Sequence, residues 1–261
     1  MHPMANTALH AARRAGQILL QGMDRLDRIH VEEKAPNDFV SSIDRQAEDA
    51  IAESLNKAYP DCAIRGEERG LTGPAGAEAT WIVDPLDGTL NYLCGIPHFA
   101  ISIALQRGRH IEHGVIIDPV RNEEWVASRG AGAHLNGKRI RVTQVRNLGK
   151  AVLATGIPPG ARGRMNEYLA VLGHFMEHCR SVRRQGSAAL DLAYTAAGRV
   201  DAFLEMGLSP WDVAAGGLLV REAGGFVGDL TGGDNWLESG DILAANPRCF
   251  KTMVARIRAC A

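Results

Sequence analysis

The sequence has no excess of either charge and no long apolar run. It contains 29 Lys and Arg against 30 Asp and Glu, a formal net charge of -1, so no global positive field argues for binding to nucleic acid. It has no run of about 18 apolar residues, the length that a membrane span needs. Its first residues lack the apolar core of a signal peptide. We therefore expect a cytoplasmic protein with no membrane segment and no direct contact with DNA.

Cysteine is scarce and has no regular spacing. The five cysteines, an odd number, never form a Cys-x-x-Cys pair. This distribution is typical of reduced thiols and argues against a disulfide framework or a zinc site. The composition, with 46% hydrophobic and 23% charged residues in 261, allows a substantial core. No internal repeat or Pro/Ser-rich linker divides the chain, so we expect one globular domain over residues 1–261.

Apolar spacing predicts two kinds of secondary structure along the chain. In an α+β half, residues 1–150, helices over residues 5–23 and 41–58 precede short strands, and Asn136-Gly137 predicts a hairpin turn. In an α/β half, residues 151–261, strands alternate with helices. The helices predicted there cover residues 168–178, 187–197 and 213–223.

The stretch WIVDPLDGTLNY, residues 81–92, places Asp84 and Asp87 three positions apart around a proline. A strand that ends at Asp84 and turns at Gly88 would aim both carboxylates into one space, with the backbone carbonyl of Leu86 between them. At about 4 Å, two like charges repel by roughly 4 kcal/mol at an effective dielectric constant of 20. The arrangement therefore calls for a cation or a proton between the carboxylates.

Two further acidic segments are candidates for the same site. Glu67 and Glu68 follow Gly66 at the end of a short apolar run, and Asp212 follows Trp211 at the start of a predicted helix. Carboxylates with a backbone carbonyl, and no His or Cys nearby in the sequence, form an all-oxygen donor set that suits Mg²⁺ better than Zn²⁺. Taken singly, Asp-Pro-x-Asp-Gly is also a common turn and Asp212 is also a good helix N-cap.

The ordered set GEE (66–68), DPLDGT (84–89) and PWDVAAG (210–216) resembles the signature segments of the inositol monophosphatase family, whose members are Mg²⁺-dependent, lithium-sensitive phosphomonoesterases. The likeness covers nearly the whole chain and is greatest to the bacterial extragenic-suppressor type. It includes KAPNDFV (34–40), GSAA (186–189) and EMG (205–207). The resemblance implies an α/β fold, an αβαβα layered sandwich that is commonly a homodimer.

The resemblance also implies two metal positions, with two or three Mg²⁺ ions per active site and inhibition by Li⁺. Glu67, Asp84, the Leu86 carbonyl and Thr89 would surround the first metal and its water, and Asp84, Asp87 and Asp212 would hold the second metal. The catalytic residues would be Glu67, Thr89 and Asp44, because a threonine hydrogen-bonded to a carboxylate can orient a water and help to deprotonate it. Asp44 also fits a first-turn acid that the helix dipole favours.

Substrate contacts are implied at two predicted helix starts and one strand end. The residues are Asp87, Gly88, Thr89, Gly186, Ser187, Ala188, Glu205 and Asp212. Backbone N–H groups at helix starts suit phosphate oxygens, and carboxylates suit polyol hydroxyls because they only accept hydrogen bonds. As alternatives, Glu205 fits a solvated strand end, and Lys34 and Asp38 fit either a loop that approaches the metals or a solvated pair. The resemblance implies that Glu67 is the metal ligand and that Glu68 lies behind Glu67 and supports it.

Two other signals are discounted. Residues 132–138 read G-x-x-x-x-G-K, as in a nucleotide P-loop, but Arg139 stands where the Ser or Thr should be and the segment has the pattern of a hairpin. His174 and His178 lie four positions apart on a predicted helix with no third ligand evident, so an exposed helix face is favoured over a metal site.

The leading prediction is Mg²⁺-dependent hydrolysis of myo-inositol monophosphate and related polyol phosphates to the alcohol and inorganic phosphate. Fructose 1,6-bisphosphatase and NADP(H) phosphatase activities are alternatives at the same site, whereas the short stretch from Glu68 to Trp81 disfavours a nucleotide 3'-phosphatase. A different class is a transcription-antitermination protein that contacts RNA polymerase, with incidental catalysis. Arg180, Arg183 and Arg184 fit a solvated strand end, a subunit contact or a guide for phosphate or RNA.

Overall fold

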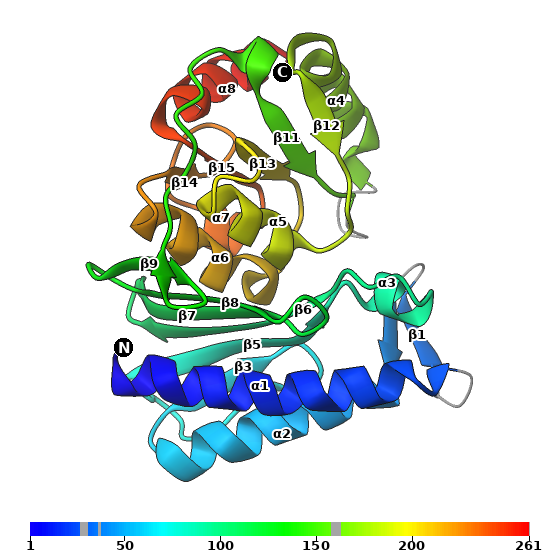
Figure 1. The fold of residues 1–261 in the computed structure, drawn as a ribbon, viewed down its shortest axis with the longest axis vertical. Coiled ribbons are helices and arrows are strands. Elements are labelled where there is room, and N and C mark those ends of the chain that lie inside the picture. Colours follow the sequence, from blue (N-terminus) through cyan, green and yellow to red (C-terminus); the bar gives the residue numbers. More distant parts are fainter. Residues whose placement is uncertain (27–30, 36–37, 158–162, 261) are drawn as a thin grey trace.

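The computed structural model describes residues 1–26, 31–35, 38–157 and 163–260, which build five layers (Figure 1). Helices α1 (Pro3–Met23) and α2 (Ser42–Ala58) lie on one face of an eight-stranded sheet. Helices α5 (Ala188–Ala196) and α6 (Pro210–Glu222) lie between this sheet and a five-stranded sheet. Helices α4 (Met165–His178) and α8 (Pro247–Cys260) cover the far side of the second sheet. The predicted αβαβα sandwich is confirmed.

The first sheet has the strand order β10-β9-β8-β7-β6-β5-β3-β4. Its strands are β3 (Ala63–Gly66), β4 (Gly70–Thr72), β5 (Ala79–Asp87), β6 (Ala100–Arg107), β7 (His110–Asp118), β8 (Glu123–Ser128), β9 (Gly132–Leu135) and β10 (Lys138–Arg139). Strands β3 and β5 run parallel, and the other neighbours are antiparallel. The carboxyl ends of β3 and β5 therefore lie side by side, which brings the GEE and DPLDGT segments together.

The second sheet has the order β12-β11-β13-β15-β14. Its strands are β11 (Val152–Thr155), β12 (Ser181–Arg183), β13 (Ala202–Glu205), β14 (Phe226–Gly228) and β15 (Ile242–Ala245). Strand β11 runs parallel to β12 and β13, and the other pairs are antiparallel. The short elements are a hairpin of β1 (Val31–Ala35) and β2 (Asp38–Ser41), the helices α3 (Thr89–Leu93) and α7 (Trp236–Ser239), and a 3-10 turn at Leu148–Lys150.

The alternation of side chains along β5 shows how the layers pack. Trp81 and Val83 belong to the apolar cluster beneath α1 and α2, whereas Ile82 belongs to the cluster around α5 and α6. A third apolar cluster joins the second sheet to α4 and α8. Because side chains alternate between the faces of a strand, Asp84 shares the α6 side with Ile82. The site is therefore built against the central layer.

Several boundaries differ from the sequence prediction. Strand β5 does not end at Asp84 but continues to Asp87 through an irregularity in its pairing with β6. Helices α4 and α6 begin at Met165 and Pro210, each three residues earlier than predicted. Lys34 and Asp38 were placed on a loop, but their backbone lies in strands β1 and β2, while α7 and α8 were not predicted at all. The division into one domain of two halves remains a prediction.

The turn at Asn136-Gly137 is confirmed, with positive φ angles of 48° and 76° at its two central residues, as a primed turn requires. This hairpin contains the G-x-x-x-x-G-K pattern, so the P-loop interpretation is excluded there by the backbone. Within the described parts of the chain, no helix combines the length and apolar character needed to cross a bilayer.

Candidate active site

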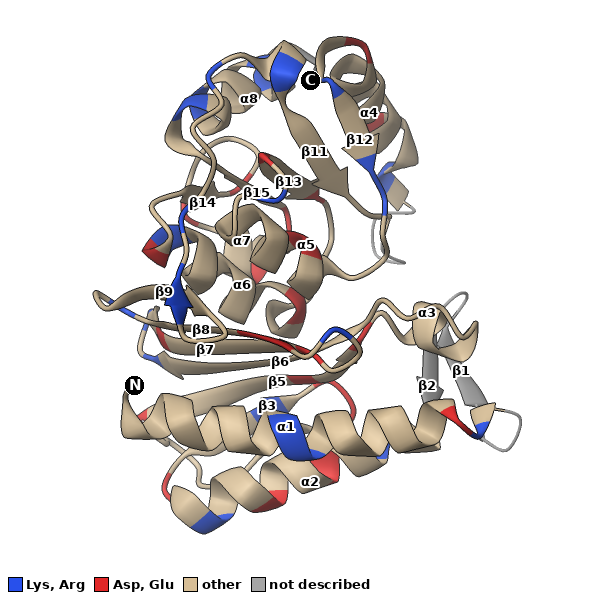
Figure 2. Cartoon of the chain, viewed as in Figure 1, with Lys and Arg blue, Asp and Glu red and all other residues tan. Residues whose placement is uncertain are grey.

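Three carboxylates from distant segments meet beside the central layer. Asp84, Asp87 and Asp212 each offer a ligand oxygen, and these oxygens all lie within 4.8 Å of one another. Figure 2 shows acidic positions where α5 and α6 face the first sheet. Asp84 and Asp87 come from the irregular end of β5, which places both carboxylates on one side. Asp212 comes from the first turn of α6.

The local structure at Asp212 differs from the simple cap that the sequence allowed. Ser209 is the N-cap of α6, Pro210 occupies the first turn, and Asp212 is the third helical residue of a capping box. The backbone N–H of Ser209 donates to Asp212 Oδ2 at 2.7 Å. The hydroxyl of Ser102 in β6 donates to the carbonyl of Trp211 at 3.1 Å, which ties the helix start to the sheet. The helix start is thereby fixed against β5 and β6.

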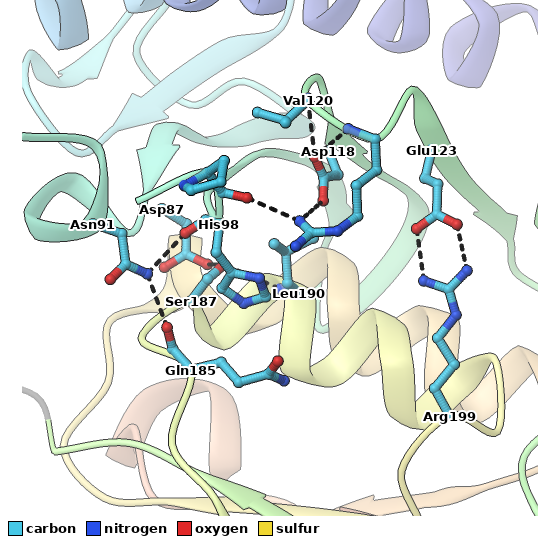
Figure 3. Close-up of polar contacts among 12 residues, drawn as sticks. Asp87, Asn91, His98, Asp118, Val120, Glu123, Gln185, Ser187, Leu190 and Arg199 are labelled. Carbon is cyan, nitrogen blue, oxygen red and sulfur yellow. Dashed lines mark hydrogen bonds and ion pairs between the residues drawn. The ribbon is translucent and has the colours of Figure 1, made fainter. Parts of the chain in front are cut away.

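Asp87 is held against the start of α5 (Figure 3). Its Oδ2 accepts hydrogen bonds from the Ser187 hydroxyl at 2.5 Å and from the Ala189 backbone N–H at 2.8 Å. Ser187 is also the N-cap of α5, and its Oγ accepts a hydrogen bond from Leu190 N at 3.3 Å. The predicted metal segment and the predicted substrate loop are therefore in direct contact.

Thr89 lies beside the same cluster. Its hydroxyl is 3.0 Å from the Leu86 carbonyl oxygen and 3.2 Å from Asp44 Oδ1, and both are acceptors. A hydroxyl has one proton, so Thr89 donates to one of them at a time. Asp44 is only 1% exposed, and Leu86 N donates to Asp84 Oδ1 at 2.9 Å. The predicted Thr89–Asp44 pair is thus present, with the Leu86 carbonyl beside it.

Glu67 lies next to this group at the end of β3. Its backbone N–H donates to the Val83 carbonyl at 3.2 Å, so it extends the pairing of β3 with β5. Its negative charge raises the pKa values of both Asp84 and Asp212. Glu67 therefore belongs to the same electrostatic cluster as the three aspartates. The backbone N–H of the next residue, Glu68, donates to the Glu48 carboxylate at 2.8 Å.

Burial is the main cause of the raised pKa values in the cluster. It raises the pKa of Asp84 well above the ordinary value, and the charges of Glu67, Asp87 and Asp212 raise it further. For Asp87 the pKa rises to about 6, because burial outweighs the hydrogen bonds from Ser187 and α5. The pKa of Asp212 is also raised, first by burial and then by Asp87 and Glu67. Without a cation, these carboxylates cannot all be charged at low cost.

The substrate side of the site contains a second buried carboxylate group. Glu205 ends β13, is only 5% exposed, and its carboxylate oxygens lie 2.4 Å from where a Cβ on Gly156 would stand. Burial and the charges of Asp191, Asp212 and Asp87 raise the pKa of Glu205. The alternative of a solvated strand end is therefore wrong for Glu205. The positive charge of Arg184 lowers the pKa of Glu205 and so lies on this side of the site.

Two residues here were missed in the sequence. Asp191 is 1% exposed and accepts a hydrogen bond from Gln185 Nε2 at 3.1 Å. The Asn91 amide donates to the carbonyls of His98 and Gln185, both at 2.8 Å, and of Gly186 at 3.3 Å (Figure 3). Both are polar residues in ordinary helical positions, and only the tertiary contacts distinguish them.

Gly88 and Gly186 face each other beside Asn91. Both have positive φ, 93° and 85°, and a Cβ on Gly88 would stand 3.1 Å from the Gly186 carbonyl oxygen. A side chain at either position would strain the backbone and press the two loops apart. These glycines allow the segment before α3 to approach the segment before α5 closely.

Other sequence signals do not join the site. The rings of His174 and His178 stack at 4.2 Å on α4, and His178 Nδ1 contacts the His174 carbonyl oxygen at 2.7 Å. Asp84, Asp87 and Asp212 form the single group of three potential ligands found among the described residues. The backbone of Lys34 and Asp38 lies in β1 and β2, and their side chains lie outside the described residues.

A large groove lies elsewhere in the described part of the chain. It has a volume of about 1770 Å³ and lies between α1 and strands β7, β8 and β9. None of the cluster carboxylates lines it. The like charges crowded between the layers therefore identify the site better than this groove does.

The donor set fits a hard divalent cation. Three carboxylates within 4.8 Å of one another, with Glu67 and the Leu86 carbonyl adjacent, supply only oxygen atoms. Oxygen donors of this kind suit Mg²⁺, which commonly binds one or two carboxylates and keeps several waters. A cation would also offset the repulsion that raises the pKa values of these carboxylates.

Comparison with known proteins identifies the family. The sequence matches the inositol monophosphatase family over residues 1–261. The chain belongs to this family. It is 49% identical over 262 residues to the Nus factor SuhB of Pseudomonas aeruginosa, with 99% of this chain and 97% of that protein covered.

Solved structures of inositol monophosphatase relatives share the fold. The crystal structure of the extragenic suppressor protein suhB from Bartonella henselae is 42% identical, covers 97% of both chains and has a TM-score of 0.92. The inositol monophosphatase from Anabaena (Nostoc) sp. PCC 7120 is 35% identical, covers 97% of this chain and 94% of its own, and has a TM-score of 0.87. The mixed α/β sandwich is thus that of the inositol monophosphatases.

The raised pKa values predict how a divalent cation such as Mg²⁺ would stabilise the protein at different pH. When folding raises the pKa of a carboxyl group, ionisation of that group lowers the free energy of unfolding. For Asp87 this loss occurs as the pH rises from the unfolded pKa, about 4, through the folded pKa, about 6. Mg²⁺ should reverse this loss where the carboxylates are charged. We expect Mg²⁺ to raise the Tm more at pH 8 than at pH 5, measured by thermal unfolding against EDTA. Equal shifts at both pH values would contradict it.

Proposed function

We propose that this protein is a Mg²⁺-dependent phosphatase that hydrolyses myo-inositol monophosphate and related polyol phosphates to the alcohol and inorganic phosphate. The observation that carries the proposal is the convergence of Asp84, Asp87 and Asp212 within 4.8 Å beside the Thr89–Asp44 pair. Membership of the inositol monophosphatase family supports it. The metal ligands proposed are Glu67, Asp84, the Leu86 carbonyl, Asp87 and Asp212.

Different residues of the protein have different roles in hydrolysis. When bound, Mg²⁺ supplies Lewis-acid charge that makes water more acidic and neutralises the phosphate oxygens. Thr89 orients the attacking water, and the buried Asp44 accepts a hydrogen bond from the Thr89 hydroxyl, which holds that hydroxyl in place. Glu67 lies at the same end of the site as Asp84 and helps to position this water.

Substrate binding is assigned to the facing helix starts. Backbone N–H groups after Gly88 and Gly186 suit phosphate and hydroxyl oxygens, together with Thr89, Ser187 and Ala188. Asp87, Asp212 and Glu205 accept hydrogen bonds from the hydroxyls of the polyol, which matches a donor-rich substrate. Glu205 is buried and Asp87 and Asp212 are half-buried, so a hydroxyl that leaves one of these carboxylates unmatched is costly.

A phosphate-release assay tests this proposal. Inositol 1-phosphate, fructose 1,6-bisphosphate, NADP and 3'-phosphoadenosine 5'-phosphate would be compared with and without Mg²⁺. We expect inositol 1-phosphate to have the highest kcat/KM and Li⁺ to inhibit. A preference for fructose 1,6-bisphosphate or NADP would replace the proposed substrate with that alternative, while the same site would remain responsible. Absence of phosphate release from all of them would contradict the proposal.

A second candidate function rests on the names of the relatives. Proteins 47–49% identical over 99% of this chain are named Nus factor SuhB. We therefore also propose a contact with RNA polymerase in transcription antitermination. A pull-down of RNA polymerase with the wild type and with Asp87→Asn separates the two functions. Equal capture by both, with hydrolysis lost only in Asp87→Asn, would show that the contact does not need the active site.

The proposed setting is the cytoplasm, with the protein as a homodimer. Its thiols and its lack of a charge excess fit that setting, and multi-angle light scattering would give the oligomeric state directly. Among the described residues, Arg183 bonds only to Ser181 and Val182.

Asn91 should support substrate binding by joining the two loops. Its amide bonds three carbonyls, from His98 and the segment before α5, and so fixes the position of Ser187. We expect Asn91→Ala to raise the KM about tenfold. Asn91→Asp should raise it further, because a carboxylate would face three carbonyl oxygens. Steady-state kinetics measure both.

Asn136→Asp is the matched control for Asn91. Asn136 Nδ2 donates to the Asn122 carbonyl at 3.1 Å at the β9–β10 turn, away from the carboxylate cluster. Its kinetics should equal those of the wild type. A KM in Asn91→Asp no higher than in Asn91→Ala would show that the donated hydrogen bonds do not matter.

A further inference from the structure

Helix α2 carries a second buried carboxylate besides Asp44. Glu48 lies one helical turn after Asp44, and each is only 1% exposed. A buried charge is costly unless it is paired or hydrogen-bonded, so a carboxylate at this position needs partners. The sequence predicted only an acidic residue near the start of the helix, and the structure shows where the carboxylate points.

Both oxygens of Glu48 are bonded to the turn that contains the proposed metal ligand. Oε2 accepts from the backbone N–H of Glu68 at 2.8 Å, and Oε1 accepts from the backbone N–H of Arg69 at 2.9 Å. The preceding N–H, of Glu67, donates to the Val83 carbonyl in β5 at 3.2 Å. Three successive backbone N–H groups, at residues 67 to 69, are therefore fixed by two different elements.

The packing of Gly66 shows how closely Glu48 approaches this turn. A Cβ on Gly66 would stand 2.2 Å from Glu48 Oε1 and 2.5 Å from its Cδ. No side chain fits between the strand end and the carboxylate. The glycine that precedes the two glutamates is thus explained by the position of Glu48, and not by backbone conformation alone.

Strand geometry then directs Glu67 to the opposite face. Ile64 belongs to the apolar cluster beneath α1 and α2, and Gly66, two residues later, faces Glu48 on α2. Because neighbouring side chains alternate between faces, Glu67 points toward the α6 side, where Asp84 and Asp212 lie. The charge of Glu67 acts on both aspartates, in agreement with this direction.

We propose that Glu48 is a positioning residue that fixes the turn at residues 67 to 69, so that the Glu67 carboxylate reaches the divalent cation. The inference rests on the proposed Mg²⁺-dependent function. Helix α2 then aligns both sides of the site, since Asp44 holds Thr89 at 3.2 Å and Glu48 holds the Glu67 turn. Supporting residues of this kind change metal affinity about 10- to 100-fold when removed.

The test compares Mg²⁺ binding by Glu48→Gln and by Asp49→Asn. Asp49 is the matched control. Its exposed carboxylate accepts hydrogen bonds from the side chain of Arg69 at 3.0 and 2.6 Å. Glu48 accepts instead from the backbone N–H of Arg69. Isothermal titration of the metal-free proteins with Mg²⁺ should show a Kd at least about tenfold higher for Glu48→Gln. Asp49→Asn should match the wild type, and kcat at saturating Mg²⁺ should largely recover in Glu48→Gln.

A double mutant separates positioning from general destabilisation. If Glu48 acts through Glu67, the Glu48→Gln/Glu67→Gln variant should bind Mg²⁺ no more weakly than Glu67→Gln alone. Additive losses would overturn the proposal. Should Glu48→Gln fail to fold, Gly66→Ala tests the same contact with the carboxylate retained, because its Cβ would displace Glu48. Wild-type affinity in Gly66→Ala or in a folded Glu48→Gln would also overturn it.

Mg²⁺ binding and phosphate release by the wild type show whether a failed test concerns this inference or the proposed function. If the wild type binds Mg²⁺ and releases phosphate while Glu48→Gln binds Mg²⁺ equally well, only the role of Glu48 is wrong. If the wild type itself neither binds Mg²⁺ nor releases phosphate, the proposed function fails, and the inference fails with it.

Discussion

Asparagine in place of Asp84 should lower kcat/KM for inositol 1-phosphate at least about 1,000-fold and at the same time stabilise the metal-free protein. Asp84 is the carboxylate that both proposed metal positions share. It is 1% exposed, and its pKa is raised by burial and by three neighbouring carboxylates. Asparagine keeps the acceptor for Leu86 N but removes the charge, so the Tm in EDTA should rise by about 3 °C.

The two effects of Asp84→Asn are measured by steady-state kinetics and by thermal unfolding in EDTA. Glu53→Gln, on the exposed side of α2 where Glu53 pairs with Arg14, is the control and should change neither. An Asp84→Asn protein that is both inactive and less stable than the wild type would show that Asp84 supports the fold rather than the chemistry.

Alanine at Thr89 should lower kcat about 100- to 1,000-fold and leave Mg²⁺ affinity close to that of the wild type. The hydroxyl contacts Asp44 and the Leu86 carbonyl, and its removal leaves the water without its orienting partner. Thr89→Ser keeps the hydroxyl and should retain most of the activity. Stopped-time phosphate assays and Mg²⁺ titration of all three proteins provide the comparison.

Asp44→Asn completes the comparison at Thr89. Its Oδ1 can still accept from the hydroxyl, but the negative charge is lost, so kcat should fall less than in Thr89→Ala. Near-wild-type activity in Thr89→Ala, with the protein folded and Mg²⁺ bound, would remove Thr89 from the proposed mechanism.

Much of the fold was accessible to local reasoning. Apolar spacing identified α1 and α2, and the Asn136-Gly137 turn gave the β9–β10 hairpin. Gly198 and Gly224 follow α5 and α6 with positive φ, the position where a glycine commonly ends a helix. Each of these features depends on residues within a few positions of one another, so it can be predicted from the local sequence.

Other boundaries depended on contacts that the sequence does not display. The end of β5 was misplaced because its pairing with β6 continues past Asp84 through an irregular register. The start of α6 was misplaced because Ser209, not Asp212, is its cap. Helix α8 was missed, although Cys249, Met253 and Ile257 recur at helical spacing and pack together in the third apolar cluster.

For the site, the acidic segments were found but not the residues that hold them. Asp84 and Asp87 stood out because two like charges are crowded into one stiff turn, and Asp212 stood out because PWDVAAG resembles a signature segment of the family. Glu48 and Asn91 lie in regular helices, and nothing in their local sequence shows that they bond backbone groups in other segments. Such support is a property of tertiary packing, which periodicity and motifs do not encode.

The most direct test of the central claim is phosphate release from inositol 1-phosphate by protein stripped of metal with EDTA, before and after Mg²⁺ is returned. The account predicts no release by the stripped protein and recovery of activity with added Mg²⁺, but no recovery in Asp84→Asn. Undiminished release from the stripped protein would contradict it, because the clustered carboxylates would then have no cation to hold during the reaction.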